Sequence, residues 1–396
     1  MKLFKNIIAI LAALTLTAGA APASVYAAPS MDISITEYAH LSSRNYFSTT
    51  DEAAAYVKQQ IKNRVSDVTF SIPATSEPIT DVFDEIMTKI LAETRIGDDG
   101  DYIRLGIYGC GYGYSSGGRS ITLKYTFTYF TNAEQEAALN EKLEEVMDSL
   151  NLDGKSDYEK ICAIHRYITN NVSYADNMDD MTIFSAYGAL VKGKAVCQGY
   201  AQLLYRMLTE AGIYSRVIEG TSNNVNHAWN IAEIDGLYYL IDATYDSAYS
   251  SLSMTPYLLK GTSDFDDADS THTHITGTGN PQSYALYPDY TSDEFNKQYK
   301  INETAYNPAN PAKGYTLGDV NSDGFINAID ASRTLYSYAE TSATGTSSFT
   351  AAELRAANVN GDKYVNAVDA SYLLKYYAEI SSGSPFTLTE FLDSLK

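Results

Sequence analysis

Apolar residues recur at helical or strand spacing through the first 150 residues of the chain. Thr49 and Glu52 form a capping-box pair ahead of one apolar stripe, and Thr131 and Glu134 form another ahead of a second stripe. Each pair predicts the start of a helix. Between these helices, residues 121–130 alternate apolar and polar positions over most of their length, which predicts a half-buried strand. The pattern is typical of a small α+β domain.

Residues 109–118 are rich in glycine and could suggest a loop that binds phosphate. A phosphate loop needs a helix N-terminus behind it, and this stretch runs into a strand instead. We therefore expect a hairpin turn here, within an N-terminal α+β domain of residues 28–150.

A further helix begins behind Ser156, which forms a capping box with Glu159. His165 falls in the apolar stripe of this helix, so we expect a packed core histidine rather than a metal ligand. Cys162 lies beside it in the sequence, and a buried free cysteine behaves as a small apolar residue. These residues open a second domain, which we expect to span residues 151–300.

Cys197 stands at the start of the next helical pattern, which ends at Gly212, a suitable residue for a helix C-terminus. Residues 227–245 then predict a pair of strands, because Asp235 and Gly236 form a two-residue hairpin-turn signal between two apolar runs. The cysteine and the strand pair belong to the same expected domain.

Folding the chain about that turn places His227 opposite Thr244 and Trp229 opposite Asp242. Because side chains repeat every second residue along a strand, His227 and Asp242 should share one face as diagonal neighbours. With Cys197 at a helix N-terminus, which favours a thiolate, the three residues have the roles of nucleophile, general base and orienting group. A small buried thiol without catalytic function is the alternative.

Two further features near these residues concern possible ligands. The backbone N–H of Cys197 is the expected oxyanion donor, and Tyr174 is a guess for a second donor. His272 and His274 would share one face of an extended segment. Without a third ligand in the sequence we expect a surface loop there rather than a metal site.

An internal repeat lies near the C-terminus: DVNSDGFINAID at residues 319–330 and NVNGDKYVNAVD at 358–369, each followed by a similar helical pattern. Side-chain oxygens at positions 1, 3, 5, 9 and 12, with a backbone carbonyl at position 7, suit calcium. Asn358 removes one charge from the second loop, and Lys363 replaces the glycine of the first, so we expect weaker binding there. Two acidic turns without metal are the alternative. The expected ligands are Asp319, Asn321, Asp323, Phe325, Asn327 and Asp330, and Asn358, Asn360, Asp362, Tyr364, Asn366 and Asp369.

The composition of the chain excludes some classes of function. The net charge of −21 argues against nucleic acid or an anionic membrane as the partner, since both require a basic surface. Three cysteines are too few for a disulfide framework in a chain of 396 residues.

The N-terminus carries two lysines and then a short apolar run, which predicts a signal peptide of residues 1–27 and a secreted protein. No later run is long and apolar enough for a membrane span. The proline-containing stretch of residues 301–316 is an expected linker, and residues 381–396 an expected tail.

The second domain resembles the transglutaminase-like core of bacterial secreted proteins. The likeness covers residues 156–246, through YGALVKGKAVCQGYAQLLYRMLTEAGIYSRVIEG, HAWNI and LIDATYD, and is weaker as far as residue 300. The resemblance implies a papain-like α+β fold with Cys197, His227 and Asp242 as the catalytic residues. Tyr245 stands where relatives often have tryptophan.

Residues 317–380 resemble a type I dockerin, which has two F-hand calcium loops, each with a following helix. The resemblance implies a small all-α domain that binds two calcium ions and docks to a cohesin module of a scaffoldin in the cellulosome. The positions that contact the cohesin in that family correspond to Ala328, Ile329, Leu335 and Tyr336, and to Ala367, Val368, Leu374 and Lys375.

Taken together, these features predict an α+β multidomain, secreted, extracellular enzyme, attached to the cell surface through a scaffoldin. We expect a cysteine acyl-transfer enzyme for a protein or peptide substrate, a protease or amidase in preference to a transglutaminase, with no cofactor for catalysis. The alternative is a catalytically idle module whose tyrosine-rich N-terminal domain binds plant cell-wall polysaccharide or protein. A glycosidase ranks lower, because no pair of carboxylates can be assigned to a sugar-binding cleft.

Overall fold

A computed structural model describes residues 35–223, 225–266, 272–276, 299–309, 314–362 and 364–395. The expected signal peptide and Lys363 lie outside these ranges, as does part of the expected linker. Within them, no helix is long and apolar enough to cross a membrane. The chain divides into two compact units, one made of residues 1–231, 240–258 and 263–295 and the other of residues 232–239, 259–262 and 296–396.

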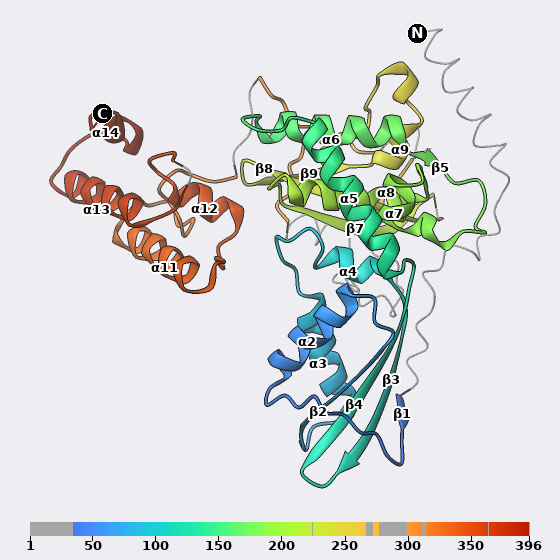
Figure 1. Ribbon diagram of the computed structural model, residues 1–396. Helices are drawn as coiled ribbons and strands as arrows, with labels where there is room; N and C mark the ends of the chain where they lie inside the picture. The colour runs from blue at the N-terminus through green and yellow to red at the C-terminus, as the bar shows by residue number, and fades with distance from the viewer. Residues whose placement is uncertain are drawn as a thin grey trace. The chain divides into compact units, whose positions relative to one another are not determined.

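The first unit begins with a four-stranded sheet in the order β1-β3-β4-β2 (Figure 1). Its strands are β1 (Ile35–Glu37), β2 (Asp67–Pro73), β3 (Ile107–Gly117) and β4 (Ser120–Tyr129). Strand β1 runs parallel to β3, and the other pairs are antiparallel. Two helices, α2 (Thr50–Lys62) and α3 (Ile79–Leu91), bury their apolar faces against this sheet in one hydrophobic core. The expected strand of residues 121–130 is therefore confirmed.

Two details of this region differ from the expectation. The glycine-rich stretch lies mostly within β3, and only Gly118, with φ of +61°, belongs to the turn. Cys110 and Tyr112 alternate with the glycines and are buried, so the stretch has the period of a strand. A Cβ atom at Gly113 would lie 2.4 Å from the ring of Tyr38, so a larger residue there would require that ring to shift.

Helix α5 (Ala133–Ser149) also begins one residue later than expected. Its N-cap is Asn132, which forms a full capping box with Gln135. Thr131 instead donates to Glu136 and accepts a hydrogen bond from Arg64, so it is part of a side-chain network and does not cap the helix.

A second sheet has the strand order β10-β7-β8-β9. Helix α6 (Asp157–Asn171) begins at the expected capping box of Ser156 and Glu159. Nearly every residue of helix α8 (Cys197–Glu210) is buried, and Gly212 beyond its end has φ of +81°. The strands and short elements are β5 (Ser173–Tyr174), η1 (Met181–Phe184), α7 (Ala186–Leu190), β6 (Lys194–Ala195), β7 (Ser215–Ser222), β8 (Val225–Ile234), β9 (Leu237–Ile241), α9 (Ala243–Ser247), η2 (Ser250–Leu252) and β10 (Ile275–Thr276).

The expected hairpin turn is present, but the second strand is shorter than expected. Asp235 and Gly236 both have positive φ, 53° and 79°, as a two-residue turn of this kind requires. Strand β9 ends at Ile241, and Asp242 caps α9 by accepting a hydrogen bond from the backbone N–H of Tyr245. The carboxylate thus has a capping function as well as its place beside His227.

Helix α4 (Asp101–Gly106) connects the N-terminal region to α8. The side-chain amide of Gln202 donates to the carbonyl of Tyr102, and that of Gln198 to the carbonyl of Leu105, both at 3.0 Å. Asp101, which is 1 % exposed, accepts from Arg216 at 2.8 Å. Burial raises the pKa of Asp101, but the guanidinium groups of Arg216 and Arg104 outweigh it and lower the pKa. These contacts fix the helix that carries Cys197.

In the second unit, a small hydrophobic core joins α11 (Ala328–Thr344), α12 (Ala351–Ala357), α13 (Ala367–Ser381) and α14 (Leu388–Asp393). Asn327 and Asn366 cap α11 and α13, each in a capping box with the last residue of its loop. Helix α12 between the two repeats was not expected. Nor was α14 in the expected tail, where Leu388 and Phe391 are buried in the same core.

Candidate active site and calcium loops

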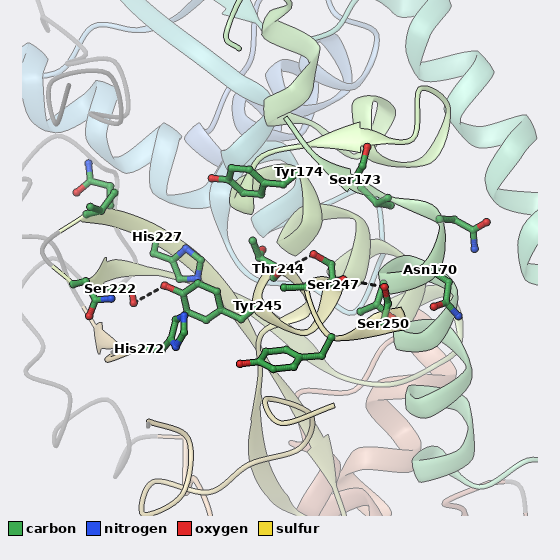
Figure 2. A pocket seen from close by; sticks show the side chains of 18 residues that line it. Asn170, Ser173, Tyr174, Ser222, His227, Thr244, Tyr245, Ser247, Ser250 and His272 are labelled. Atoms are coloured by element: carbon green, nitrogen blue, oxygen red, sulfur yellow. Dashed lines mark hydrogen bonds between the residues drawn. The ribbon is translucent and has the colours of Figure 1, made fainter. Parts of the chain in front are cut away.

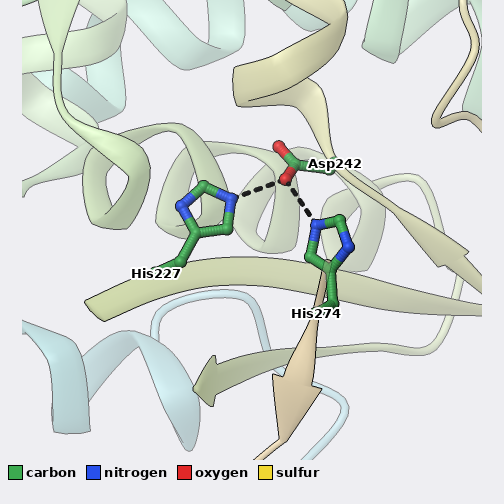
Figure 3. A group of neighbouring side chains, drawn as sticks. All are labelled: His227, Asp242 and His274. Atoms are coloured by element: carbon green, nitrogen blue, oxygen red, sulfur yellow. Dashed lines mark hydrogen bonds and ion pairs between the residues drawn. The ribbon is translucent and has the colours of Figure 1, made fainter. Parts of the chain in front are cut away.

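Cys197 is the first residue of α8, behind the N-cap residue Val196. His227 lies on β8, and Asp242 follows β9. His227 Nε2 is 2.6 Å from Asp242 Oδ2, and Asp242 is fully buried (Figure 3). Cys197 also acts on this imidazole, because its thiol is among the groups that raise the pKa of His227. The structure brings the three sequence-predicted residues together.

The charges of this group are strongly coupled. Burial alone would lower the pKa of His227, but the Asp242 carboxylate and the Cys197 thiol outweigh burial and raise it to about 10. Burial would raise the pKa of Asp242, and the His227 and His274 rings hold it well below its usual range. The raised pKa favours the imidazolium form of His227, the form that can stabilise a neighbouring thiolate.

His274 also belongs to this group, which corrects the expected surface loop. Its side chain is 3 % exposed, with Nε2 at 3.1 Å from Asp242 Oδ2 and Nδ1 at 2.9 Å from Asp266 Oδ1 (Figure 3). Its ring stacks on Phe265 with centroids 4.0 Å apart. The sequence contained a weak signal, the two histidines with strand spacing, but the contact with Asp242 spans 32 residues and no local pattern predicts it.

His227, Asp242 and His274 also form the one group of three possible metal ligands found in the described part of the chain, with ligand atoms within 4.8 Å of one another. A histidine must lose its proton to bind a metal ion through that nitrogen. Because the pKa of His227 is raised to about 10, its Nε2 retains the proton that it shares with Asp242. The donor set favours a hydrogen-bonded chain over a metal centre.

A cavity of about 820 Å³ opens beside His227 (Figure 2). Tyr174, 44 % exposed, lines it, and its proposed part in an oxyanion hole stays a prediction. Cys197 is 7 % exposed and is not among the lining residues. No lysine, arginine, aspartate or glutamate occurs among the described lining residues: Thr169, Asn170, Asn171, Val172, Ser173, Tyr174, Ser222, Asn223, Val225, Asn226, His227, Thr244, Tyr245, Ser247, Ala248, Tyr249, Ser250 and His272.

All three cysteines lie in the described ranges, and each is a free thiol. Cys110 is buried, and burial raises its pKa to about 12. Cys162 is only partly buried, so the expectation of a buried residue is wrong, and burial still raises its pKa. His165 is packed in the core as expected, with Nε2 at 2.9 Å from the buried Asp246.

In the two repeated loops, acidic side chains accept hydrogen bonds from the backbone of the loop. In the first loop, Asp319 accepts hydrogen bonds from the backbone of Asp323 and Gly324, and Asp330 from that of Val320 and Asn327. Gly324, at position 6, has φ of +84°, which provides the sharp turn.

The second loop has the same plan. Asp369 is fully buried, and Asn360 and Asn366 donate their backbone N–H groups to it. Burial and the neighbouring Asp362 carboxylate raise the pKa of Asp369. A divalent cation would offset this repulsion, so the donor set fits calcium.

The eight positions expected to contact a cohesin are exposed. Ile329, Tyr336 and Val368 are 56 %, 60 % and 47 % exposed. The remaining five, Ala328, Leu335, Ala367, Leu374 and Lys375, are also exposed. Apolar residues that are exposed together in this way mark an interaction surface.

Comparison with known proteins identifies both regions. Residues 145–243 match the family model of the transglutaminase-like superfamily, and residues 317–383 match that of the dockerin type I domain. The chain contains a transglutaminase-like domain and a type I dockerin domain. The expected α+β class with a helical dockerin is confirmed.

The individual relatives have low sequence identity to this chain and match only part of it. Kyphoscoliosis peptidase is 29 % identical in Mus musculus and 28 % identical in Homo sapiens, over 120 residues that cover 26 % of this chain and 18 % of each relative. This chain thus spans less than a fifth of the length of these two relatives.

Among solved structures, one of a TGase is 16 % identical and covers 40 % of this chain and 57 % of its own, with a TM-score of 0.26. A protein assigned as a cysteine protease from Cytophaga hutchinsonii is 22 % identical, and the match covers 32 % of this chain and 53 % of that protein's chain, with a TM-score of 0.24. Scores this low support no structural argument.

Proposed function

We propose that the transglutaminase-like domain is a cysteine acyl-transfer enzyme, with Cys197 as nucleophile, His227 as general acid and base, and Asp242 as the orienting group. The observation that carries the proposal is the contact of 2.6 Å between His227 and the buried Asp242, together with the influence of the Cys197 thiol on the pKa of His227. A nucleophile beside a base that a third group orients is the arrangement that such catalysis requires.

The reaction follows from this geometry. The Cys197 thiolate attacks an amide carbonyl carbon, and the negative oxygen is stabilised by the backbone N–H of Cys197 at the start of α8. The C–N bond then breaks, the amine leaves with the proton from His227, and a thioester remains. Water attacks the thioester, its proton passes to His227, and the released thiolate pairs again with the imidazolium.

Hydrolysis is favoured over transfer to a second amine. At neutral pH a lysine side chain is an ammonium ion, and a site for it needs a carboxylate or a means of removing the charge. The described residues that line the cavity beside His227 include no carboxylate. We therefore infer a protease or amidase that acts on a protein or peptide.

The dockerin supports an extracellular location for this activity. We propose that its loops bind two calcium ions through the twelve ligands predicted above, and that the eight exposed positions bind a cohesin of a scaffoldin. The expected signal peptide, residues 1–27, and the net charge of −21 support a secreted, cellulosomal protein that works near plant cell-wall polysaccharide. The domain limits proposed above complete this arrangement, with residues 301–316 as linker.

The low exposure of the Cys197 thiol favours a second candidate function. The thiol is 7 % exposed and outside the cavity lining, as in a domain that binds a substrate without cleaving it. Such a module would hold protein or polysaccharide for other enzymes on the scaffoldin.

One experiment separates the two candidates. The wild-type protein and Cys197→Ala are treated with an activity-based probe for cysteine nucleophiles and then with a peptide library. We expect the probe to label Cys197 and the wild type alone to cleave peptides. Binding to insoluble cellulose or xylan by both proteins, without labelling or cleavage, would favour the idle module.

A further inference from the structure

His274 lies on the opposite side of the Asp242 carboxylate from His227. Both imidazoles contact the same oxygen, Oδ2, at 2.6 Å for His227 and 3.1 Å for His274. The other oxygen, Oδ1, accepts from the backbone N–H of Tyr245 at 2.9 Å. Three donors from separate segments therefore fix a carboxylate that is fully buried.

Asp266 in turn fixes His274. Its Oδ1 lies 2.9 Å from Nδ1 of the ring and accepts from the backbone N–H of His274 at 3.0 Å. Each ring nitrogen of His274 thus faces a carboxylate oxygen. A neutral imidazole has one N–H donor, so both contacts are hydrogen bonds only when both ring nitrogens carry a proton.

The surroundings leave His274 few other partners. Its ring packs on Phe265, at 4.0 Å between centroids, and on the edge of Trp229 at 5.0 Å. The titratable groups around it, from every segment that packs against it, are Asp242, Asp266, His227, Tyr245 and Tyr257, with His272 behind the two tyrosine rings.

We propose that His274, held by Asp266, is a positioning residue that orients the Asp242 carboxylate for its work on His227. The site is then a chain of five groups, Asp266, His274, Asp242, His227 and Cys197, in which carboxylates and imidazoles alternate and the thiol comes last. The proposal rests on the catalytic roles proposed above. It adds that the second imidazole prevents Asp242 from rotating and shares its charge, so that the first imidazole remains directed at the sulfur.

The test measures alkylation of Cys197 by iodoacetamide between pH 5 and pH 10 in the full-length, calcium-loaded chain. The extent is read by mass spectrometry of the peptide that contains Cys197. The variants are His274→Phe, which keeps a ring on Phe265, His274→Gln, which keeps one N–H donor for Asp242, and Asp266→Asn. Replacing the exposed His40 by glutamine is the matched control.

We expect His274→Phe to slow alkylation at neutral pH roughly ten-fold or more, as the loss of a hydrogen bond to a charged group implies. The pH of half-maximal rate should move upward, because a less well oriented His227 stabilises the thiolate less. His274→Gln should recover part of the rate, and the control should match the wild type.

Long-range ¹H–¹⁵N spectra of the five histidines provide a second measurement. In the wild type, both ring nitrogens of His274 should give the shifts of hydrogen-bonded nitrogens, and Asp266→Asn should change the shift of Nδ1. This measurement also decides the question if His274→Phe does not fold.

Failure of this inference and failure of the proposed function give different results. A wild-type Cys197 that does not react overturns the catalytic proposal. A reactive wild-type Cys197, with an unchanged rate and an unchanged half-maximal pH in His274→Phe and His274→Gln, overturns only the positioning role. A His274 variant with a lower melting temperature but an unchanged pH profile of Cys197 alkylation would also overturn the positioning role, because that result describes a purely structural side chain.

Discussion

Replacing Asp242 by asparagine tests the ion pair at the centre of the site. The pKa of His227 is about 10 in the folded protein against 6.5 for an ordinary histidine. This difference corresponds to about 5 kcal/mol of stabilisation. Breaking a buried ion pair by removing one partner costs about 3–5 kcal/mol, which agrees.

The sign of the pH dependence follows from the raised pKa. The stabilisation by protonated His227 is fully present below pH 6.5 and is lost as the pH rises through about 10. The lowered pKa of Asp242 adds stabilisation that is present above its ordinary value of 3.8 and is lost as the pH falls below that value. We therefore expect Asp242→Asn to lower the free energy of unfolding by about 3–5 kcal/mol at pH 6 and by less than about 1 kcal/mol at pH 10.

Trp229 makes the assay specific to this domain. It is the sole tryptophan of the chain, it is buried, and its ring lies 6.0 Å from that of His227. Urea unfolding followed by tryptophan fluorescence therefore reports the transglutaminase-like domain and not the dockerin. An equal loss of stability at pH 6 and pH 10 would refute the reasoning.

Three further results are expected from the structure and the sequence. Amide turnover should decline as the pH rises through about 10, where His227 loses the proton that the leaving amine requires, and a decline centred near pH 7 would contradict the assignment. Calcium chelation should reduce the helicity of the dockerin. Asp330→Ala should reduce calcium affinity more than Asp369→Ala, because the second loop has one fewer acidic ligand. Isothermal titration that ranks the two loops the other way would contradict this. Burial raises the pKa of Glu93, beside Arg216, to about 7, so its ionisation costs up to about 3 kcal/mol as the pH rises from 4.5 to 7. Glu93→Gln should therefore gain in stability relative to the wild type above pH 7 and not below pH 4.5, and urea titrations with an equal difference at both values would be inconsistent with this.

The sequence predicted the elements that local chemistry determines. The capping box at Ser156 gave the start of α6, and the turn signal at Asp235 and Gly236 gave the hairpin. From that turn alone, the pairing of strands placed His227 and Asp242 within reach of each other, and they are 2.6 Å apart.

What the sequence did not predict depends on distant contacts or on competition between neighbouring residues. His274 reaches Asp242 from 32 positions away, and only the folded chain brings them together. Thr131 and Asn132 are both good capping residues, and the network around Arg64 decides between them. The strand expected as far as Tyr245 ends early because Asp242 caps a helix.

The central claim is that Cys197, at the start of α8 and in the same site as His227, is the reactive nucleophile of the chain. Cys162 is an internal reference, because it is a free and partly exposed thiol of the same chain whose pKa is raised. The most direct measurement is the rate of iodoacetamide alkylation of both cysteines at pH 7, read from their separate peptides in one digest. The account predicts that Cys197, although 7 % exposed, reacts roughly ten times faster or more than Cys162. A Cys197 that reacts no faster than Cys162 would contradict it.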